Sequence, residues 1–419
     1  MTLHFFHFSS LRKPSGLFTT SFLESLGDSF SRSLLPIVAV SFLNTGTQIV
    51  GIINSFGLIA FLLLSLPLGI LADRTGAPHK LMLFGTISRA VLTLSVVFTF
   101  SLGLLKDGIG IAILMMLALL IGIADVAFSS GQSLLIPQLV AQSEVRSIYG
   151  KVQAISQTGG ALGPLMLSVT LAMLAAPIAW IISAIFYIFS AFSQRTIPVP
   201  KASPTEIRAK QSPFQQVKDG VRELFSHSSL AIVTTSNALT NASVMAANTL
   251  VPVIALTILN LSPAQFAFTA IFGSISGILG ASYASALTDK FGLAQTRIFS
   301  GLALFVGLAT LCIVVQVQIH QYSLIAICFQ YALNGACTAM LMVSSSDLAP
   351  QMITVERLGA VMGAARTLVI GVMPLSALTF GMLGAVFGII PAMWLWLALT
   401  LLAVFPTFFL PRSLKNHSF

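Results

Sequence analysis

The sequence predicts an all-α membrane protein with twelve transmembrane helices in two pseudo-symmetric six-helix bundles. Three observations lead to this prediction. Hydrophobic residues make up 56% of the 419 residues and charged residues only 8%, long apolar runs recur along the chain, and landmarks of the first half reappear in the second. A soluble core could not hold this much apolar surface, so we expect the chain to lie in a lipid bilayer.

Twelve apolar runs are long enough to cross a bilayer, for which a helix needs about 20 residues. They cover residues 18–42, 48–71, 81–105, 110–135, 148–173, 175–193, 229–257, 263–287, 295–316, 322–346, 359–383 and 386–410. One long polar segment, rich in Pro, Lys and Arg, follows the sixth run. We therefore expect an N-terminal bundle at 1–193, a cytoplasmic loop at 194–228 and a C-terminal bundle at 229–419.

The positive charges are distributed unevenly between the two sets of connecting segments. With the N-terminus in the cytoplasm, 17 of the 21 Lys and Arg residues, Arg297 among them, fall on the cytoplasmic side, and only Lys106 stands opposite. This asymmetry predicts that both termini are cytoplasmic. The net charge of +9 therefore reflects membrane orientation rather than a nucleic-acid-binding surface. We expect a plasma membrane, with a bacterial inner membrane as the first candidate.

The first span carries three charges in an otherwise apolar and small-residue run. Glu24, Asp28 and Arg32 are four residues apart and fall along one stripe of a helix. Each such charge costs about 2.5–3.5 kcal/mol on insertion scales. Arg32 can neutralise one acid, so a surplus carboxylate is expected to face an aqueous cavity. In an alternative interpretation, Asp28 and Arg32 form a purely intrahelical pair.

Ordered polar faces occur on the first, fourth, seventh and tenth spans, which predicts that these spans line a central cavity. The candidate cavity residues beyond the first span are Asp125, Gln153, Gln157, Asn237, Asn241, Asn248, Gln330 and Asn334. Arg89 in the third span should reach the same depth as Asp125, so these two are expected to form a buried pair. The asparagines could instead connect neighbouring helices.

Landmarks of the first half recur in the second at a nearly constant offset. The segment Gly69–Gly76 reads GILADRTG after the second span, and Ser285–Gly292 reads SALTDKFG after the eighth. Gly122 precedes a Pro-Gln pair by fifteen residues in the first half, as does Gly335 in the second. These recurrences predict a duplicated six-helix unit, and duplicated halves with a site between them are a transporter architecture.

At these residues the chain resembles the major facilitator superfamily. Gly69–Gly76 is similar to its G-x-L-A-D-R-x-G loop, although Ala77 and Pro78 stand where a basic pair usually follows. The resemblance implies two bundles that alternate access to a midplane cavity, and a monomer. It implies a cytoplasmic gate made of Gly69, Asp73, Arg74, Gly76, Asp289, Lys290 and Gly292.

Two further motifs refine the resemblance. Gly159, Gly163 and Pro164 are similar to a signature of the antiporters of the superfamily, which implies a helix bend and close helix approach. The Gly27-Asp28 pair, Arg89 and Leu135–Val140 resemble the branch that includes enterobactin exporters and macrolide efflux pumps.

No motif for an enzyme, a nucleotide site, a metal site or a cofactor is present. The three cysteines, Cys312, Cys328 and Cys337, lie in apolar spans and predict neither a disulfide nor a zinc site. The hypothesis is a secondary active transporter that exports a small amphipathic solute, such as a drug or siderophore, in exchange for protons carried by Asp28 or Glu24. The alternatives are an ion-coupled importer or facilitator and a non-transporting membrane sensor.

Overall fold

The computed structural model describes residues 15–75, 77–140, 144–198, 213–346 and 348–410, and these contain helices but no strand. Twelve helices follow the twelve predicted spans, which confirms the all-α fold. They are α1 Ser15–Ser41, α2 Thr47–Thr75, α3 Pro78–Ser101, α4 Asp107–Leu139, α5 Val145–Met173, α6 Ala176–Gln194, α8 Ser228–Val253, α9 Pro263–Phe291, α10 Leu293–Val317, α11 Ser323–Val343, α13 Val355–Val386 and α14 Ile389–Val404. A π-helical turn, η1 Ile254–Ile258, extends α8, while the 3₁₀ turns η2 His320–Tyr322 and η3 Phe405–Phe409 precede α11 and follow α14.

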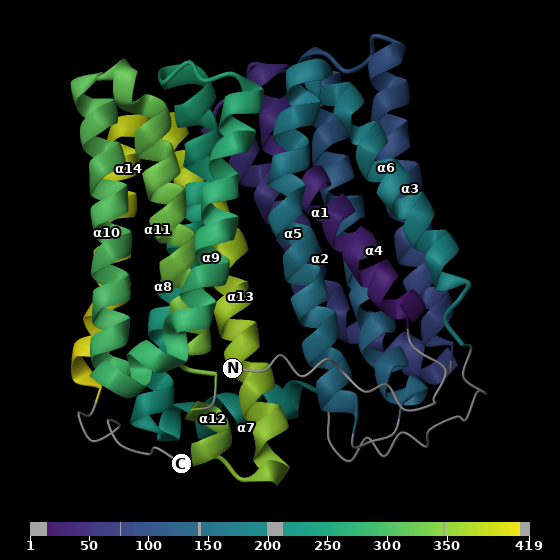
Figure 1. Cartoon of the computed structure of the whole chain (residues 1–419), viewed down its shortest axis with the longest axis vertical. Helices are drawn as coiled ribbons and strands as arrows, with labels where there is room; N and C mark the ends of the chain where they lie inside the picture. The colour runs from purple at the N-terminus through teal and green to yellow at the C-terminus, as the bar shows by residue number, and fades with distance from the viewer. Residues whose placement is uncertain (1–14, 76, 141–143, 199–212, 347, 411–419) are drawn as a thin grey trace, which may run out of the picture.

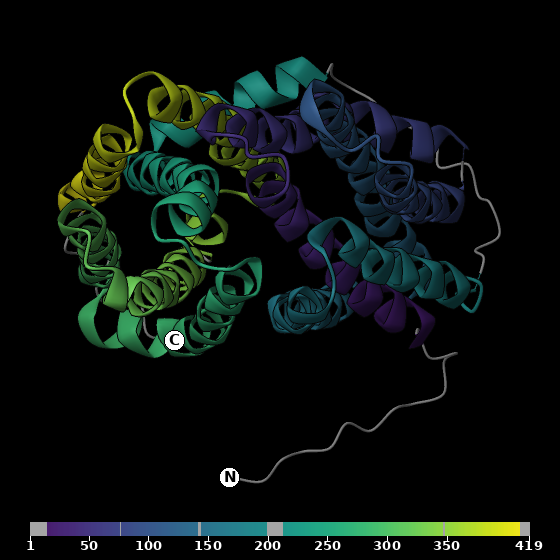
Figure 2. The ribbon, with the colours of Figure 1, turned by 90° about the horizontal axis from the view of Figure 1, so that it is seen from above.

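The helices form two groups that lie side by side (Figures 1 and 2). Helices α1–α6 make one group, which we call the N-terminal bundle, and α8–α11, α13 and α14 make the other, the C-terminal bundle. Two short helices, α7 Pro213–Ser226 and α12 Leu348–Met352, lie at one end of the molecule (Figure 1). We call this the α7 end, and the opposite end, with the turns at 42–46 and 387–388, the turn end.

Ten helices in the described part of the chain are long and apolar enough to cross a membrane. The two other long helices are α1, which carries three charged residues, and α5, which is rich in polar residues. These two helices pack against each other. The least apolar helices of the N-terminal bundle are therefore neighbours, and each covers part of the polar surface of the other.

Close contacts between glycines recur in the two bundles. A Cβ atom on Gly122 of α4 would lie 2.6 Å from the carbonyl oxygen of Gly57 in α2, and a Cβ on Gly335 of α11 would collide with the carbonyl of Gly273 in α9. Gly57 and Gly273 are separated along the chain by the same number of positions as Asp73 and Asp289 of the repeated loop motif. Glycines at corresponding positions of the sequence repeat thus make the same kind of helix contact in each bundle.

The apolar core is shared by the bundles at the turn end and divided at the α7 end. One large cluster includes Phe30 and Leu114 of the N-terminal bundle together with Leu250 and Leu311 of the C-terminal bundle. At the α7 end, a cluster around Leu17 contains residues of the N-terminal bundle, whereas a separate cluster around Leu230 contains residues of the C-terminal bundle and α7. The described side chains therefore join the bundles mainly at the turn end.

Helix α7 lies inside the segment 194–228, which the sequence led us to expect as a connecting loop. It packs on α13, with Leu224 buried and Gly220 close to the backbone of Ala360. Glu223 of α7 forms an ion pair of 2.7 Å with Arg357. The apolar residues Val217, Val221 and Leu224 recur at helical spacing, so an amphipathic helix could have been recognised inside this charged segment.

Candidate functional site

A cavity of about 340 Å³ lies between the two bundles. Helices α1, α2 and α5 line it from one side, and α8, α9, α11 and α13 from the other. Its polar lining includes Arg32, Asn54 and Asn248, and its aromatic lining includes Phe266 and Tyr331, whose rings meet edge to face at 6.4 Å. A cavity of this size, mostly apolar with a few polar groups, suits a small amphipathic molecule.

A chain of alternating charges runs from this cavity into the N-terminal bundle. Arg32 contacts Asp28 at 2.7 Å on its own helix and Asp125 of α4 at 2.8 Å. Asp125 also contacts Arg89 of α3 at 3.4 Å, so the pair expected between these two residues is present. Arg89 in turn forms an ion pair with Glu24. Three carboxylates and two guanidiniums therefore alternate in one network with a surplus of one negative charge.

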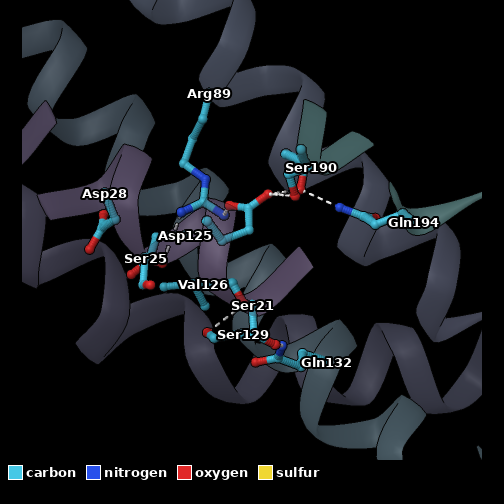
Figure 3. Close-up of polar contacts among 12 residues, drawn as sticks. Ser21, Ser25, Asp28, Arg89, Asp125, Val126, Ser129, Gln132, Ser190 and Gln194 are labelled. Carbon is cyan, nitrogen blue, oxygen red and sulfur yellow. Dashed lines mark hydrogen bonds and ion pairs between the residues drawn. The ribbon is translucent and has the colours of Figure 1, made fainter. Parts of the chain in front are cut away.

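The inner end of the network is enclosed. Glu24 is 3% exposed and accepts hydrogen bonds from Thr86 at 2.5 Å and from Ser190 at 2.7 Å. Arg89 is 1% exposed, and its guanidinium lies 4.9 Å from the ring centroid of Tyr187. Arg89 and Ser190, which are both labelled in Figure 3, each contact the Glu24 carboxylate. The prediction that Glu24 lines the cavity is therefore wrong. Arg89, rather than Arg32, pairs with Glu24, and together with two hydroxyl groups it holds the carboxylate inside the bundle.

The outer end of the network is open. The side chains of Asp28 and Arg32 are 28% and 43% exposed, compared with 1% and 4% for Arg89 and Glu24. One carboxylate oxygen of Asp28, Oδ1, is nevertheless buried and has no hydrogen-bond partner among the described residues. Arg32 is shared between two acids, so Asp28 is the carboxylate with the fewest compensating contacts. The purely intrahelical pairing of Asp28 and Arg32 does not hold, because Arg32 also contacts Asp125.

The glycine-proline motif of α5 brings this helix close to α1. A Cβ atom on Gly159 would lie 2.8 Å from the carbonyl oxygen of Phe22, and a Cβ on Gly163 would lie 2.6 Å from the Cβ of Ser29. Pro164 lines the inter-bundle cavity. Gln153 and Gln157 are exposed on the same helix, nearer to the α7 end. The motif thus fixes the α1–α5 contact beside the charged network.

The polar residues expected on α8 and α11 are divided among different surroundings. Asn248 lines the inter-bundle cavity, and its carbonyl oxygen accepts a hydrogen bond of 3.0 Å from Asn54 of α2. Asn241 donates to the carbonyl of Val369 at 3.4 Å, while Gln330 is buried with 6% exposure. Neither of these last two lines the described cavity, because Gln330 is covered by neighbouring helices and the half-buried Asn241 is held against α13.

Asn237 and Asn334 lie around a different feature, a buried arginine in the C-terminal bundle. Arg297 is 1% exposed and donates to the Oδ1 atom of Asn237 at 2.7 Å. Asn334 lines a small pocket that also contacts Arg297. The sequence interpretation counted Arg297 among the cytoplasmic loop cations, and this is wrong. The fifth residue of α10 turns into the bundle, where carbonyl and hydroxyl groups accept its hydrogen bonds.

The expected gate residues are described only in part. Asp289 and Lys290 are exposed at the end of α9, with the Lys290 ammonium 5.2 Å from the ring of Phe291. Gly292 has φ +83 between α9 and α10, a conformation that favours glycine. Gly69, Asp73 and Arg74 belong to the last turns of α2, but their side chains lie outside the described part, as does the whole of Gly76.

Contacts across the two bundles were not foreseen from the sequence. Thr47 of α2 donates to the carbonyl of Gly381 in α13 at 2.9 Å, and Ser168 of α5 donates to the carbonyl of Ala264 in α9 at 2.9 Å. Both lie at the turn end. The guanidinium carbon of Arg366 in α13 lies 5.2 Å from the ring centroid of Phe61 in α2. Such contacts depend on which helices meet, which single-sequence patterns do not contain.

Comparison of the sequence with known protein families identifies the family of this chain. The sequence profile described as "Major Facilitator Superfamily" matches residues 17–367 of the chain, from α1 into α13. The chain belongs to the Major Facilitator Superfamily. It is therefore an integral membrane transporter, with a small-molecule substrate and a lipid bilayer around it. No curated protein sequence matches it.

Solved structures of transporters share the superfamily fold. The nucleoside transporter NupG superimposes with a TM-score of 0.73 at 13% identity, over 97% of this chain and 99% of that chain. A bacterial homologue of the human lysosomal transporter Spinster gives 0.69 at 12%, over 96% and 97%. A bacterial homologue of the iron transporter ferroportin gives 0.68 at 14%, over 98% and 100%. At these identities the likeness shows the fold alone.

Proposed function

We propose that this superfamily member is a proton-coupled exporter of a small amphipathic solute, and that Asp28 is the residue at which proton and solute compete. The observation that carries the proposal is the surplus carboxylate at the outer end of the charged network, paired with Arg32, which lines the cavity. Two arginines neutralise two of the three acids, and Asp28 retains an unpartnered oxygen. Burying an uncompensated charge costs several kcal/mol, so closing the cavity around the empty, deprotonated network is unfavourable.

A proton on Asp28 removes that surplus charge, and so does a bound solute with a hydrogen-bond donor or a positive group beside it. Each would displace the other, and either would allow the bundles to close over the cavity. The fluxes of solute and proton are then coupled in opposite directions. Glu24 is less suited to this role, because Arg89, Thr86 and Ser190 already compensate its charge.

The arrangement of the bundles supports alternating access. They share an apolar core at the turn end and have separate clusters at the α7 end, which is the expected cytoplasmic side. The structures of the Spinster and ferroportin homologues to which this chain is similar are both described as inward-facing. We therefore propose that this conformation is the one that receives solute from the cytoplasm.

The first experiment identifies a solute and tests coupling. Export of dyes, macrolides and siderophores is screened in cells, and the best solute is followed in proteoliposomes with an imposed pH gradient. Asp28→Asn should abolish gradient-driven transport while solute exchange in the absence of a gradient persists. Asp107→Asn, an exposed acid with φ +51, is the matched control and should behave as wild type. Gradient-driven transport by the Asp28→Asn protein would exclude Asp28 as the coupling residue.

The second experiment tests the need to open the turn end. Cysteines at positions 168 and 264 of a variant without the three native cysteines would form a cross-link where Ser168 meets Ala264. Oxidation should stop transport, and reduction should restore it. Each single-cysteine variant should transport under both conditions. Full transport by the cross-linked protein would contradict alternating access about this contact.

A further inference from the structure

Arg297 is a buried cation for which the described side chains supply no carboxylate. Its guanidinium donates to the carbonyl of Leu341 at 3.0 Å, to Ser345 at 3.3 Å, to Ser236 at 3.2 Å and to Asn237 at 2.7 Å. All four acceptors are neutral, and the Nε group is buried with no partner. Neutral acceptors satisfy hydrogen bonds but leave the positive charge uncompensated, which is costly inside a bundle.

A pocket of about 20 Å³ lies against this guanidinium, and it is large enough for a water molecule or a small ion. Hydroxyl and amide groups of Ser236, Thr240 and Asn334 line it together with Arg297. The pocket is enclosed by α8, α10, α11 and α14 and is separate from the cavity between the bundles. Its size excludes a phosphate ester or a carboxylate-bearing metabolite.

The N-terminal bundle provides a comparison for the described surroundings of Arg297. Trp180 donates to Ser31 at 3.0 Å, and Trp396 donates to Ser243 at 2.9 Å, so the two serines occupy corresponding places in α1 and α8. Seven residues before each serine stand Glu24 and Ser236, respectively. The N-terminal bundle thus places a carboxylate where the C-terminal bundle has a hydroxyl group.

Each of these residues contacts an arginine of its own bundle. Glu24 forms an ion pair with Arg89, whereas Ser236 accepts a hydrogen bond from Arg297. We propose that a chloride-sized monovalent anion binds in the pocket beside Arg297 and supplies the negative charge that Glu24 supplies in the N-terminal bundle. The hydroxyl protons of Ser236 and Thr240 are donated to the carbonyls of Ala403 and Ser236, so the donor to the anion would be the unpartnered Nε group of Arg297, which also provides the charge.

The proposal is tested on the purified full-length protein by thermal unfolding in sodium chloride and in sodium gluconate at equal ionic strength. Because an ion that binds the folded state stabilises it, chloride should raise the Tm saturably, by about 2–4 °C. Arg297→Gln should unfold at the same temperature in both salts. Arg357→Gln, whose side chain is 67% exposed, is the matched control and should keep the chloride effect.

A second variant restores the carboxylate instead of removing the arginine. Ser236→Asp should be as stable in gluconate as wild type is in chloride, and it should not respond to chloride. A crystal grown in sodium bromide should give an anomalous peak beside the Arg297 guanidinium in wild type and none in Ser236→Asp. The stability of Ser236→Asp and the bromide peak test the anion site even if Arg297→Gln fails to fold.

Three results would overturn the proposal. The first is equal stability of wild type in chloride and gluconate, and the second is an undiminished chloride effect in Ser236→Asp. The third is a wild-type crystal grown in bromide without a peak beside Arg297. None of these results bears on Asp28, so the anion site can fail while proton coupling at the inter-bundle cavity holds.

Discussion

The N-terminal and C-terminal bundles share a scaffold but not a charge distribution. Each has a glycine contact between its second and fourth long helices and a tryptophan-to-serine hydrogen bond between its sixth and first. The N-terminal bundle, however, contains a connected network of five charged residues, whereas the C-terminal bundle buries Arg297 against neutral groups.

The difference in charge between the bundles is seen at corresponding positions of α1 and α8. When the two helices are aligned on the serines that accept from the tryptophans, Glu24, Asp28 and Arg32 correspond to Ser236, Thr240 and Val244. Two duplicated bundles have therefore kept the contacts that hold helices together and changed the residues that hold charge. The comparison teaches that the packing positions define the repeat, while the charged network, to which we assign the coupling in our proposal, belongs to the N-terminal bundle.

The largest effect is expected from removing the central arginine of the network. Arg89→Gln leaves Glu24 buried without its positive partner and should lower stability by about 3–5 kcal/mol. Arg297→Gln leaves only neutral acceptors unpaired and should cost about 1–3 kcal/mol. Thermal unfolding in one detergent and in chloride compares the two. The double variant Glu24→Gln/Arg89→Gln should recover part of the loss, and equal losses for the two arginine variants would erase the proposed distinction between the bundles.

A smaller effect, similar in both bundles, is expected at the repeated glycine contacts. Gly122→Ala and Gly335→Ala each place a methyl group against the carbonyl of a neighbouring helix, so each should cost about 1–3 kcal/mol. Gly363→Ala in α13 is the control, because a Cβ there meets nothing within 4 Å. It should be neutral or stabilising by up to about 1 kcal/mol.

The measurement for the glycine variants is again the Tm of the purified proteins. A destabilised Gly122→Ala protein beside an unaffected Gly335→Ala protein would mean that the two contacts are not equivalent. The sequence repeat would then describe the order of the helices but not their packing.

Most of the fold was predictable because bilayer thickness and hydropathy fix the spans. The repeat was predictable because glycine and motif spacings survive in both halves. Helix α7 was missed since its apolar stripe is short and lies in a charged segment. The identity of the helices that meet across the bundles, such as α2 with α13 and α5 with α9, depends on tertiary packing.

The site was predictable in part for related reasons. Helical spacing put Glu24, Asp28 and Arg32 near one stripe, but residues four apart advance by about 40 degrees around a helix at each step. Glu24 therefore turns toward α3 and α6, whereas Arg32 lines the cavity and Asp28 contacts Arg32. The role of Thr86 and Ser190 as hydrogen-bond donors carries no sequence signal, because serine and threonine are common in transmembrane helices.

The smallest effect is expected at the two tryptophans, and it should differ between the bundles. Trp180→Phe removes the donor to Ser31, which is fully buried, and should cost about 1–2 kcal/mol. Trp396→Phe removes the donor to Ser243, but this hydroxyl keeps a hydrogen bond of 2.7 Å with Thr400. Trp396→Phe should therefore lower the stability by about 0.5 kcal/mol, which is at the low end for one hydrogen bond.

Because these variants change the intrinsic fluorescence, unfolding is better followed with a thiol-reactive fluorogenic dye. Cys312 and Cys337 are buried and become reactive when the C-terminal bundle opens. Adding Thr400→Val to Trp396→Phe removes the second partner of Ser243, and the combined loss should then approach that of Trp180→Phe. If the double variant loses no more stability than the sum of the losses of Trp396→Phe and Thr400→Val, the Thr400 hydroxyl does not compensate Ser243.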